Sequence, residues 1–379
     1  MKRIAFVDLT NFKNWPAGGM LQYELAILPY LVKEYQVDIW GVSVNGVVNS
    51  EIYINDISYP IKTFANVKTK SKLIPNYWRG LQLIFKKKEF KQYDIVYVHT
   101  GSCAVALSKI IDRTKTLLVY HQHGLSHLHD YALMSLLQRP FVNKAQYISD
   151  LVFVVSDSES VDTYYKTISS KVIGKIKSIG SPIDLTLFTK QKTIHKDNII
   201  KLIYTGRIDS HKDVCTLIEM LNYLKLKTTD FQLTIVGDGD EREKVKRLIN
   251  YYNLESKVIM RGVQPRKNVL KELIDSDIYV TASIGEGVSI SVLEAYASGL
   301  PVVCFNVPGL SKQVVNKVTG RVIEKGNVEL MADAIVDVMH NLNQYHLNAL
   351  NEAKKYDSEI ISKIIITEIN KSFSKLEAN

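Results

Sequence analysis

Residues 281–303 read Thr-Ala-Ser-Ile-Gly-Glu-Gly-Val-Ser-Ile-Ser-Val-Leu-Glu-Ala-Tyr-Ala-Ser-Gly-Leu-Pro-Val-Val, and they predict a strand, a glycine-flanked loop and a helix. The strand ends near Thr281 and the helix begins near Ser289. Glu286 then lies in the loop, and Glu294 lies on the second helical turn. The unpaired N–H groups at a helix start favour an anionic group. Two carboxylates beside that group could accept hydrogen bonds from the hydroxyls of a sugar or ribose.

Short apolar runs alternate with amphipathic stretches along nearly the whole chain, which predicts parallel sheets with helices on both faces. The predicted strands are 2–8, 36–42, 94–98, 116–120, 151–155, 200–205, 231–236, 256–260, 277–281 and 301–305. The predicted helices are 20–34, 102–112, 157–168, 212–227, 240–252, 266–274 and 289–298, and 328–379 is mostly helical. The expected class is α/β with doubly wound sheets, which bind ligands beyond the carboxyl ends of their strands.

The polar stretch 188–199 has no helical or alternating periodicity and divides the predicted strands into two sets of five. We therefore predict a first domain over 1–187, a linker over 188–199 and a second domain over 200–355. Two such domains facing each other would form a cleft.

A second group of polar residues follows the first predicted strand of the second domain. Residues 204–213 read Tyr-Thr-Gly-Arg-Ile-Asp-Ser-His-Lys-Asp. Gly206 would let a ligand approach the backbone. Arg207 could fork onto phosphate oxygens, and Lys212 would add a point charge near the next helix. Solvated basic residues are the plainer interpretation, but their place at a strand's carboxyl end favours phosphate binding.

The first domain carries two further candidate features. Gly18 and Gly19 lie between the first strand and the first helix, where backbone N–H groups could meet phosphate or where the pair could simply form a turn. Four of the nine histidines fall within nine residues: His121, His123, His127 and His129. No cysteine or acid lies at ligand spacing before Asp130, and the loop lacks the HxxxH arrangement on a helix that zinc sites use. We expect substrate contacts from His123 or His121, and a metal or a purely structural cluster remains the alternative.

Two Asp-x-Asp triplets, at 238–240 and 275–277, could hold a divalent metal on a nucleotide sugar, as in a metal-dependent GT-A transferase. A tight turn and a helix end explain them more simply. The chain has no GxxxxGK[ST], GxGxxG or GxSxG motif, which argues against a P-loop NTPase, a dinucleotide oxidoreductase and an α/β-hydrolase.

The composition is that of a globular protein. The 379 residues are 23% charged and 46% hydrophobic, and no apolar run approaches the ~18 residues of a membrane-spanning helix. The start of the chain has too short an apolar stretch for a signal peptide. Its three cysteines are scattered, which fits a reducing cytoplasm. The net charge of +9 indicates an anionic partner without naming it.

That charge is concentrated in residues 62–92, which contain nine Lys or Arg and one acid. Apolar and aromatic residues are mixed with the basic ones, and part of the segment is similar to a helix that lies on anionic lipid. The candidate membrane-facing residues are Trp78, Arg79, Lys86, Lys87 and Lys88. A solvated helix packed on the first domain is the competing interpretation.

The second half resembles the retaining glycosyltransferases of family 4, which have the GT-B fold. Glu286 and Glu294 match the family's Glu-x7-Glu motif. Other matching segments, in the family's order, are Gly206-Arg207 with Lys212, Ile235–Gly239 with Glu241, Val258–Gly262, Pro308-Gly309 and Thr319–Ile323. The first half matches more loosely, at Gly18-Gly19, His123-Gly124, Val154–Ser156 and Gly180–Asp184. Val288-Ser289 stand where the family commonly has Phe-Gly, a difference that bears on the donor sugar more than on the reaction.

The resemblance implies a role for each matching residue. Arg207 and Lys212 would bind the donor diphosphate and stabilise the leaving nucleotide. Glu294 would hold the ribose, and Glu286 would hold sugar hydroxyls together with the backbone of Gly287, Val288 and Ser289. The base would lie against the backbone near Arg261, Gly262 and Val263. His123 would contact the donor from the opposite domain, with Gly18 and Gly19 near the phosphate or acceptor and His121 on the acceptor side. The C-terminal helix, about 356–379, would cross back onto the first domain.

The function implied is transfer of a sugar, with retention and without a metal or other cofactor, from a UDP-sugar or another nucleotide diphosphate sugar. The acceptor would be a glycan or lipid-linked glycan of a bacterial surface polysaccharide such as a capsule. We expect a cytoplasmic protein, at most peripheral on the inner face of the cell membrane. The alternatives are a GT-B sugar-nucleotide epimerase and a basic nucleic-acid-binding protein with a degenerate transferase-like half.

Overall fold

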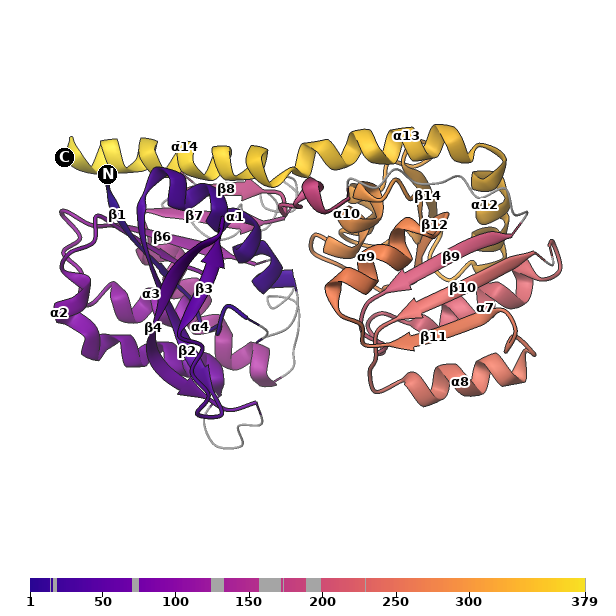
Figure 1. Ribbon diagram of the computed structural model, residues 1–379, viewed down its shortest axis with the longest axis horizontal. Helices are drawn as coiled ribbons and strands as arrows, with labels where there is room; N and C mark the ends of the chain where they lie inside the picture. The colour runs from indigo at the N-terminus through magenta and orange to yellow at the C-terminus, as the bar shows by residue number, and fades with distance from the viewer. Residues whose placement is uncertain are drawn as a thin grey trace. The chain divides into compact units, whose positions relative to one another are not determined.

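The computed structural model describes residues 1–13, 15, 19–69, 75–123, 133–156, 172, 174–188, 199–228 and 230–378. They divide into two compact units, Met1–Pro182 with Ser358–Asn379 and Ile183–Asp357 (Figure 1). The division therefore lies a few residues before the expected linker, because Ile183 and Phe188 pack into the core of the second unit. Almost all of the predicted linker 188–199, and the predicted helix 157–168, lie outside the described residues.

The sheet of the first unit has the strand order β3-β4-β2-β1-β5-β6-β7-β8. Its strands are β1 (Arg3–Val7), β2 (Gln36–Val44), β3 (Glu51–Ile54), β4 (Ile57–Val67), β5 (Ile95–Val98), β6 (Leu117–Gln122), β7 (Leu151–Val155) and β8 (Ile176–Ile179). All pairings are parallel except that of β3 with β4. The sequence did not predict β3, β4 or β8, because they carry many exposed or polar side chains instead of a buried apolar run.

Helices cover both faces of this sheet. They are α1 (Gly19–Glu34), the 3₁₀ helix η1 (Asn76–Lys86), α2 (Lys87–Phe90), α3 (Gly101–Leu107), α4 (Leu133–Ile148) and α14 (Ser358–Glu377). α14 packs along α1, where the Tyr35 hydroxyl donates a hydrogen bond to Asn370 Oδ1 at 2.9 Å. The C-terminal helix therefore belongs to the first unit. Within the described ranges, no helix combines the length and the apolar character needed to cross a bilayer.

The second unit is built on a parallel sheet with the strand order β11-β10-β9-β12-β13-β14. The strands are β9 (Ile200–Thr205), β10 (Phe231–Val236), β11 (Val258–Gly262), β12 (Ile278–Thr281), β13 (Val302–Phe305) and β14 (Gly320–Ile323). The helices are η3 (Leu185–Phe188), α7 (Val214–Leu224), α8 (Arg242–Tyr251), α9 (Arg266–Ile274), α10 (Ile290–Ala297), α11 (Leu310–Gln313), α12 (Val328–His340), α13 (Leu342–Ala353) and η4 (Lys354–Tyr356). This is the Rossmann strand order.

The strand order reverses once in each sheet, and the reversal marks where a ligand can enter. In the first unit the switch lies between β1 and β5, and in the second unit it lies between β9 and β12. At a switch point the loops leave neighbouring strands toward opposite faces and open a crevice at the carboxyl ends. The residues after β1, β5, β9 and β12 are therefore the first places to look for a site.

Candidate functional site

The loop after β9 is shaped by two glycines. Gly206 has φ +154°, and a Cβ there would lie 2.7 Å from the hydroxyl of Tyr204. A Cβ on Gly237, after β10, would lie 1.8 Å from the carbonyl oxygen of Gly206. The two loops therefore touch backbone to backbone, which only glycine allows.

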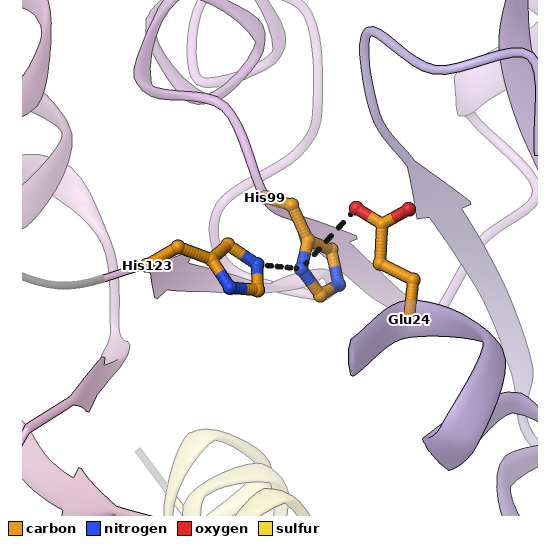
Figure 2. Close-up of side chains that lie close together, drawn as sticks. All are labelled: Glu24, His99 and His123. Carbon is orange, nitrogen blue, oxygen red and sulfur yellow. Dashed lines mark hydrogen bonds and ion pairs between the residues drawn. The ribbon is translucent and has the colours of Figure 1, made fainter. Parts of the chain in front are cut away.

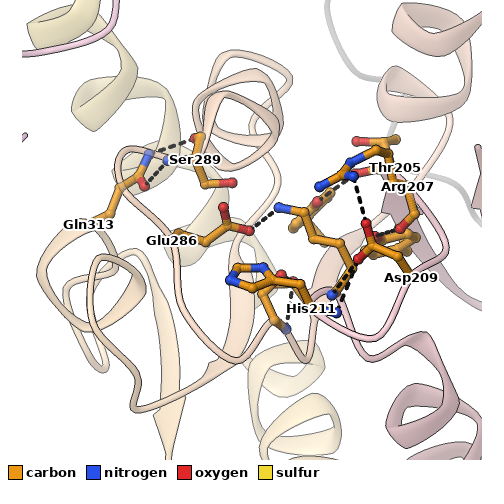
Figure 3. A network of polar contacts seen from close by, with 12 residues as sticks. Thr205, Arg207, Asp209, His211, Glu286, Ser289 and Gln313 are labelled. Carbon is orange, nitrogen blue, oxygen red and sulfur yellow. Dashed lines mark hydrogen bonds and ion pairs between the residues drawn. The ribbon is translucent and has the colours of Figure 1, made fainter. Parts of the chain in front are cut away.

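This loop presents the basic residues predicted from the sequence. The side chain of Arg207 is 76% exposed and pairs with Asp209 at 2.9 Å. The other oxygen of Asp209 accepts hydrogen bonds from the backbone N–H groups of His211 and Lys212, at 3.1 and 3.0 Å. Asp209 thus fixes the turn that carries Lys212, a role that the sequence did not reveal (Figure 3).

The loop after β12 meets the loop after β9. The ammonium of Lys212 pairs with the Glu286 carboxylate, and both side chains are largely buried. The N–H of Ile284 also donates to the carbonyl of His211 at 3.0 Å. The structure therefore brings together two of the predicted site residues that lie far apart in sequence, at the switch point of this sheet. Figure 3 labels His211 and Glu286, one from each of the two loops.

Residues further along the chain support the Glu286 loop. The N–H of Glu286 donates to the carbonyl of Pro308 at 3.0 Å. Gly309 has φ +84°, and a Cβ there would lie 2.2 Å from the carbonyl oxygen of Glu286. The side chain of Gln313 accepts from the N–H of Ser289 at 2.9 Å and donates to its carbonyl at 2.8 Å. These two hydrogen bonds fix the position of Ser289, the residue directly before the first residue of α10.

Glu294 lies on α10 and is 8% exposed. Its carboxylate accepts a hydrogen bond from Arg266 Nη1 at 2.7 Å. Burial raises the pKa of Glu294, and the charge and hydrogen bond of Arg266 act against that rise. Arg266 begins α9, and no motif marked it in the sequence.

The remaining predicted donor-binding residues are exposed or half-buried at the same strand ends. Gly262 closes β11 with φ +67°, and Val263 beside it is 77% exposed. The Nε of Arg261 pairs with Glu272 at 2.8 Å. Gly287 and Val288 are half-buried in the loop before α10. This edge therefore offers backbone groups and an apolar surface to a ligand.

A second cluster lies at the switch point of the first unit. His99 follows β5, His123 follows β6 and Glu24 projects from α1 (Figure 2). Nδ1 of His99 lies 2.9 Å from Nε2 of His123 and 3.7 Å from Oε1 of Glu24. Neither carboxylate oxygen of Glu24 has a hydrogen-bond partner among the described residues. One ligand atom from each of the three side chains lies within 4.8 Å of the others, and among the described residues this is the group that could hold a metal ion.

Burial controls the protonation of this cluster. It raises the pKa of Glu24 well above its usual range, and the nearby charge of Asp8 raises it further. Burial also lowers the pKa of His99 well below its usual range and that of His123 to about 3. The imidazoles are therefore neutral at physiological pH, so each can donate one hydrogen bond and accept one.

His121 does not lie where an acceptor contact was expected. Its side chain is completely buried, and its Nδ1 lies 2.6 Å from the hydroxyl of Tyr97. It sits inside β6, one position before the strand ends, whereas His123 follows the strand and is only half-buried. Gly19 is exposed at the start of α1, while Gly18, His127 and His129 lie outside the described residues.

The sequence analysis identified only one of the three residues of the cluster in the first unit, His123. His99 follows β5 singly, and Glu24 lies in the middle of an otherwise apolar helix face. The carboxylate of the cluster is that of Glu24, which lies on α1, far from the histidines in sequence, so no ligand-spacing pattern around the histidines could reveal it. The available signal was a charged residue at a buried helical position, which is rare without a partner.

Comparison with known proteins agrees with this geometry. Residues 187–356 match the family model for glycosyl transferases group 1. An uncharacterized glycosyltransferase of Haemophilus influenzae is 32% identical over 193 residues, which are 50% of this chain and 53% of that protein. The putative colanic acid biosynthesis glycosyltransferase WcaL of Salmonella typhimurium is 26% identical over 186 residues, 45% of this chain and 46% of that protein. The chain spans about half the length of these curated relatives.

The fold is also found in a solved structure. HepE of Anabaena in complex with UDP is similar with a TM-score of 0.73 and 18% identity, over 98% of this chain and 100% of that chain. The likeness shows the fold, and it confirms the prediction of two Rossmann-like units as in GT-B glycosyltransferases. Residues 187–356, which carry the loops after β9 and β12, are thus the part of the chain that is similar to the glycosyl transferases group 1 family.

Proposed function

We propose that this protein is a glycosyltransferase that moves a sugar from a nucleotide diphosphate sugar to a glycan or lipid-linked acceptor. The observation that carries the proposal is the meeting of Lys212 and Glu286 at the switch point between β9 and β12, with Arg207 exposed beside them. A cation, an acceptor-only carboxylate and a helix start suit a phosphate joined to a sugar.

Donor binding would rearrange the pair. Lys212 and Glu286 neutralise each other in this structure, and a diphosphate that takes the ammonium frees the carboxylate to accept from a sugar hydroxyl. Arg207, exposed on the same loop, can then fork onto the phosphate oxygens. As the sugar leaves, negative charge develops on the phosphate, and these two cations stabilise it. On this proposal the transfer needs no divalent metal at the diphosphate.

The nucleotide would extend along the same strand ends. Glu294, oriented by Arg266, would accept hydrogen bonds from the ribose. The backbone near Arg261, Gly262 and Val263 would meet the base, and the backbone of Gly287–Ser289 would meet the sugar. His123 is proposed as a donor contact supplied by the first unit.

The finer details come from similar proteins and from the family resemblance. A UDP donor is favoured because HepE, which has the same fold, binds UDP. A surface polysaccharide is favoured because the similar protein WcaL is described as a putative colanic acid biosynthesis glycosyltransferase. Retention of the anomer, by same-face attack with the departing phosphate accepting the proton, follows from the resemblance to family 4. We further propose that the protein works peripherally at the inner face of the cell membrane, where a lipid-linked acceptor would lie.

A melting-temperature panel tests the proposal. UDP-, GDP- and ADP-sugars are added to the wild type, to Lys212→Ala and to the control Lys246→Ala, an exposed lysine on α8 that pairs with Glu243. A ligand at about 100 times its Kd stabilises by about 2.7 kcal/mol, which is roughly 5–11 °C for a domain of this size. One class should stabilise the wild type and the control and should stabilise Lys212→Ala much less. Silence across the panel, or equal shifts in all three proteins, would contradict the proposal.

A sugar-nucleotide epimerase would give the same melting result. The two functions separate when the donor is incubated without an acceptor. An epimerase converts it into another sugar, whereas a transferase leaves the sugar's configuration unchanged and releases nucleotide only when an acceptor or water takes the sugar.

A further inference from the structure

The segment 76–91 of the first unit, called here the 76–91 surface, has one buried side and carries exposed apolar and basic side chains elsewhere. It begins with η1, and in a 3₁₀ helix residues three apart lie above one another. One such row contains Gly80 and Leu83, which are buried. The next row has Trp78 and Ile84 exposed with half-buried Leu81 between them, and the third has Phe85 exposed after half-buried Arg79 and Gln82. Lys87 and Lys88, the first two residues of α2, are exposed as well.

Close packing fixes the direction of the exposed rows. A Cβ on Gly80 would lie 2.4 Å from Ser102 Oγ and 2.8 Å from Cys103 Sγ, so η1 lies directly against α3. Leu83 is completely buried in the core of the unit. Phe90, in α2, packs its ring 4.8 Å from that of Trp40. The 76–91 surface cannot turn its apolar residues inward without losing these contacts.

The exposed residues combine apolar and basic side chains. Phe85 is 85% exposed, Ile84 45% and Trp78 38%. The acid Glu89 pairs with Lys86 at 3.4 Å. Within the described part of the chain, no ion pair engages Lys87, Lys88 or Lys91. An aromatic side chain left in water beside unpaired lysines is the arrangement of an element that lies in a membrane interface.

We propose that the 76–91 surface binds an anionic lipid bilayer. Phe85 and Ile84 enter the boundary between headgroups and acyl chains, and Trp78 lies at headgroup level. Lys87, Lys88 and Lys91 contact the anionic headgroups. This proposal adds a partner to the proposed function. It rests on that function in one respect, which is that the bilayer would be the place where the acceptor lies.

Vesicle flotation tests the binding directly. The full chain is floated with vesicles of phosphatidylcholine alone and with vesicles that also contain phosphatidylglycerol, at low and at physiological salt. We expect binding to the anionic vesicles only, and weaker binding at higher salt. Lys87→Gln with Lys88→Gln should lower the partition coefficient about 25-fold, since each lysine near an anionic surface contributes about fivefold. Phe85→Ser should lower it about tenfold or more through lost apolar burial.

Matched variants in the same unit provide the controls. Lys109→Gln with Lys115→Gln removes the same charge from the exposed loop between α3 and β6, and Tyr53→Ser removes an exposed aromatic ring from β3. Both should float like the wild type. Equal binding to neutral vesicles, or equal losses in the control variants, would overturn the proposal.

Two further measurements distinguish lipid binding from nucleic-acid binding and from failure of the proposed function. Tight binding of an oligonucleotide that is lost in the double lysine variant but unchanged in Phe85→Ser would identify nucleic acid as the partner and overturn the lipid assignment. The nucleotide-sugar melting shifts should be the same in all of these variants. Loss of flotation with those shifts intact therefore concerns the 76–91 surface, whereas absent shifts concern the proposed function.

Discussion

Arg266→Ala should leave the buried Glu294 carboxylate without its cation. The two side chains meet at 2.7 Å, and they are 36% and 10% exposed. Removing one partner of a fully buried pair costs 3–5 kcal/mol, whereas an exposed pair contributes about 0–1 kcal/mol. This half-buried pair lies between those limits, so we expect the second unit to lose about 2 kcal/mol. The melting temperature should then fall by roughly 4–8 °C.

The loss should depend on pH and on the charge of Glu294. Burial already raises the pKa of Glu294 and Arg266 opposes the rise, so the variant raises that pKa further. A carboxyl group with a raised pKa in the folded state destabilises the fold as pH rises above its unfolded value. The penalty should therefore grow between pH 4.5 and 8, and it should be small in a Glu294→Gln background, where no charge remains to be paired.

Urea unfolding of the four proteins of this double-mutant cycle measures the coupling. Arg242→Ala is the matched control, because Arg242 pairs with Asp238 at 2.9 Å on an exposed part of the same unit and should cost under about 1 kcal/mol. A loss as large in the Glu294→Gln background as in the wild type would refute the reasoning, as would a loss no greater than that of Arg242→Ala.

Three other perturbations probe the two clusters. Burial and Asp8 raise the pKa of Glu24, so the wild type should lose stability as pH rises above 4.5. Glu24→Gln should therefore gain stability relative to the wild type, by up to about 1.4 kcal/mol per pH unit. Free energies of urea unfolding that change in parallel for the two proteins from pH 5 to 8 would contradict this. Gly309→Ala should cost at least about 2 kcal/mol and weaken nucleotide-sugar binding, since its Cβ would strike the Glu286 loop; calorimetry showing wild-type affinity would argue against that support. A chelator should leave the donor-induced melting shift unchanged, and a shift lost with chelator and restored by Mn²⁺ would indicate a metal at the diphosphate.

The strand–helix alternation could be predicted from the sequence because central strands of a parallel sheet are apolar on both faces. All ten predicted strands are present, with ends that differ by a few residues at most. β3 and β4 were missed because they pair at the edge of the sheet, where side chains such as Tyr53 remain exposed. Part of the basic segment 62–92 was expected to be helical, and its later part is, in η1 and α2, whereas β4 extends to Val67.

The site was predictable where a residue lies next to a strand end in sequence. Lys212 and Glu286 could each be assigned to a strand's carboxyl end, but only the sheet order shows that β9 and β12 are neighbours and that the two side chains meet. Arg266, Gln313 and Glu24 act through contacts with distant residues and belong to no motif. Tertiary packing alone reveals such residues.

The most direct test of the account is to measure nucleotide release and product configuration together. The sugar donor selected by the melting panel is incubated with the wild type and with Lys212→Ala, with and without lipid-linked glycan acceptors, and proton NMR follows the anomeric signals. We predict acceptor-dependent release of the nucleoside diphosphate, a product that keeps the anomeric configuration of the donor, and a loss of rate in Lys212→Ala. A bound donor that is never consumed, a product of inverted configuration, or a rate unchanged in Lys212→Ala would contradict the proposed transfer at the β9–β12 switch point.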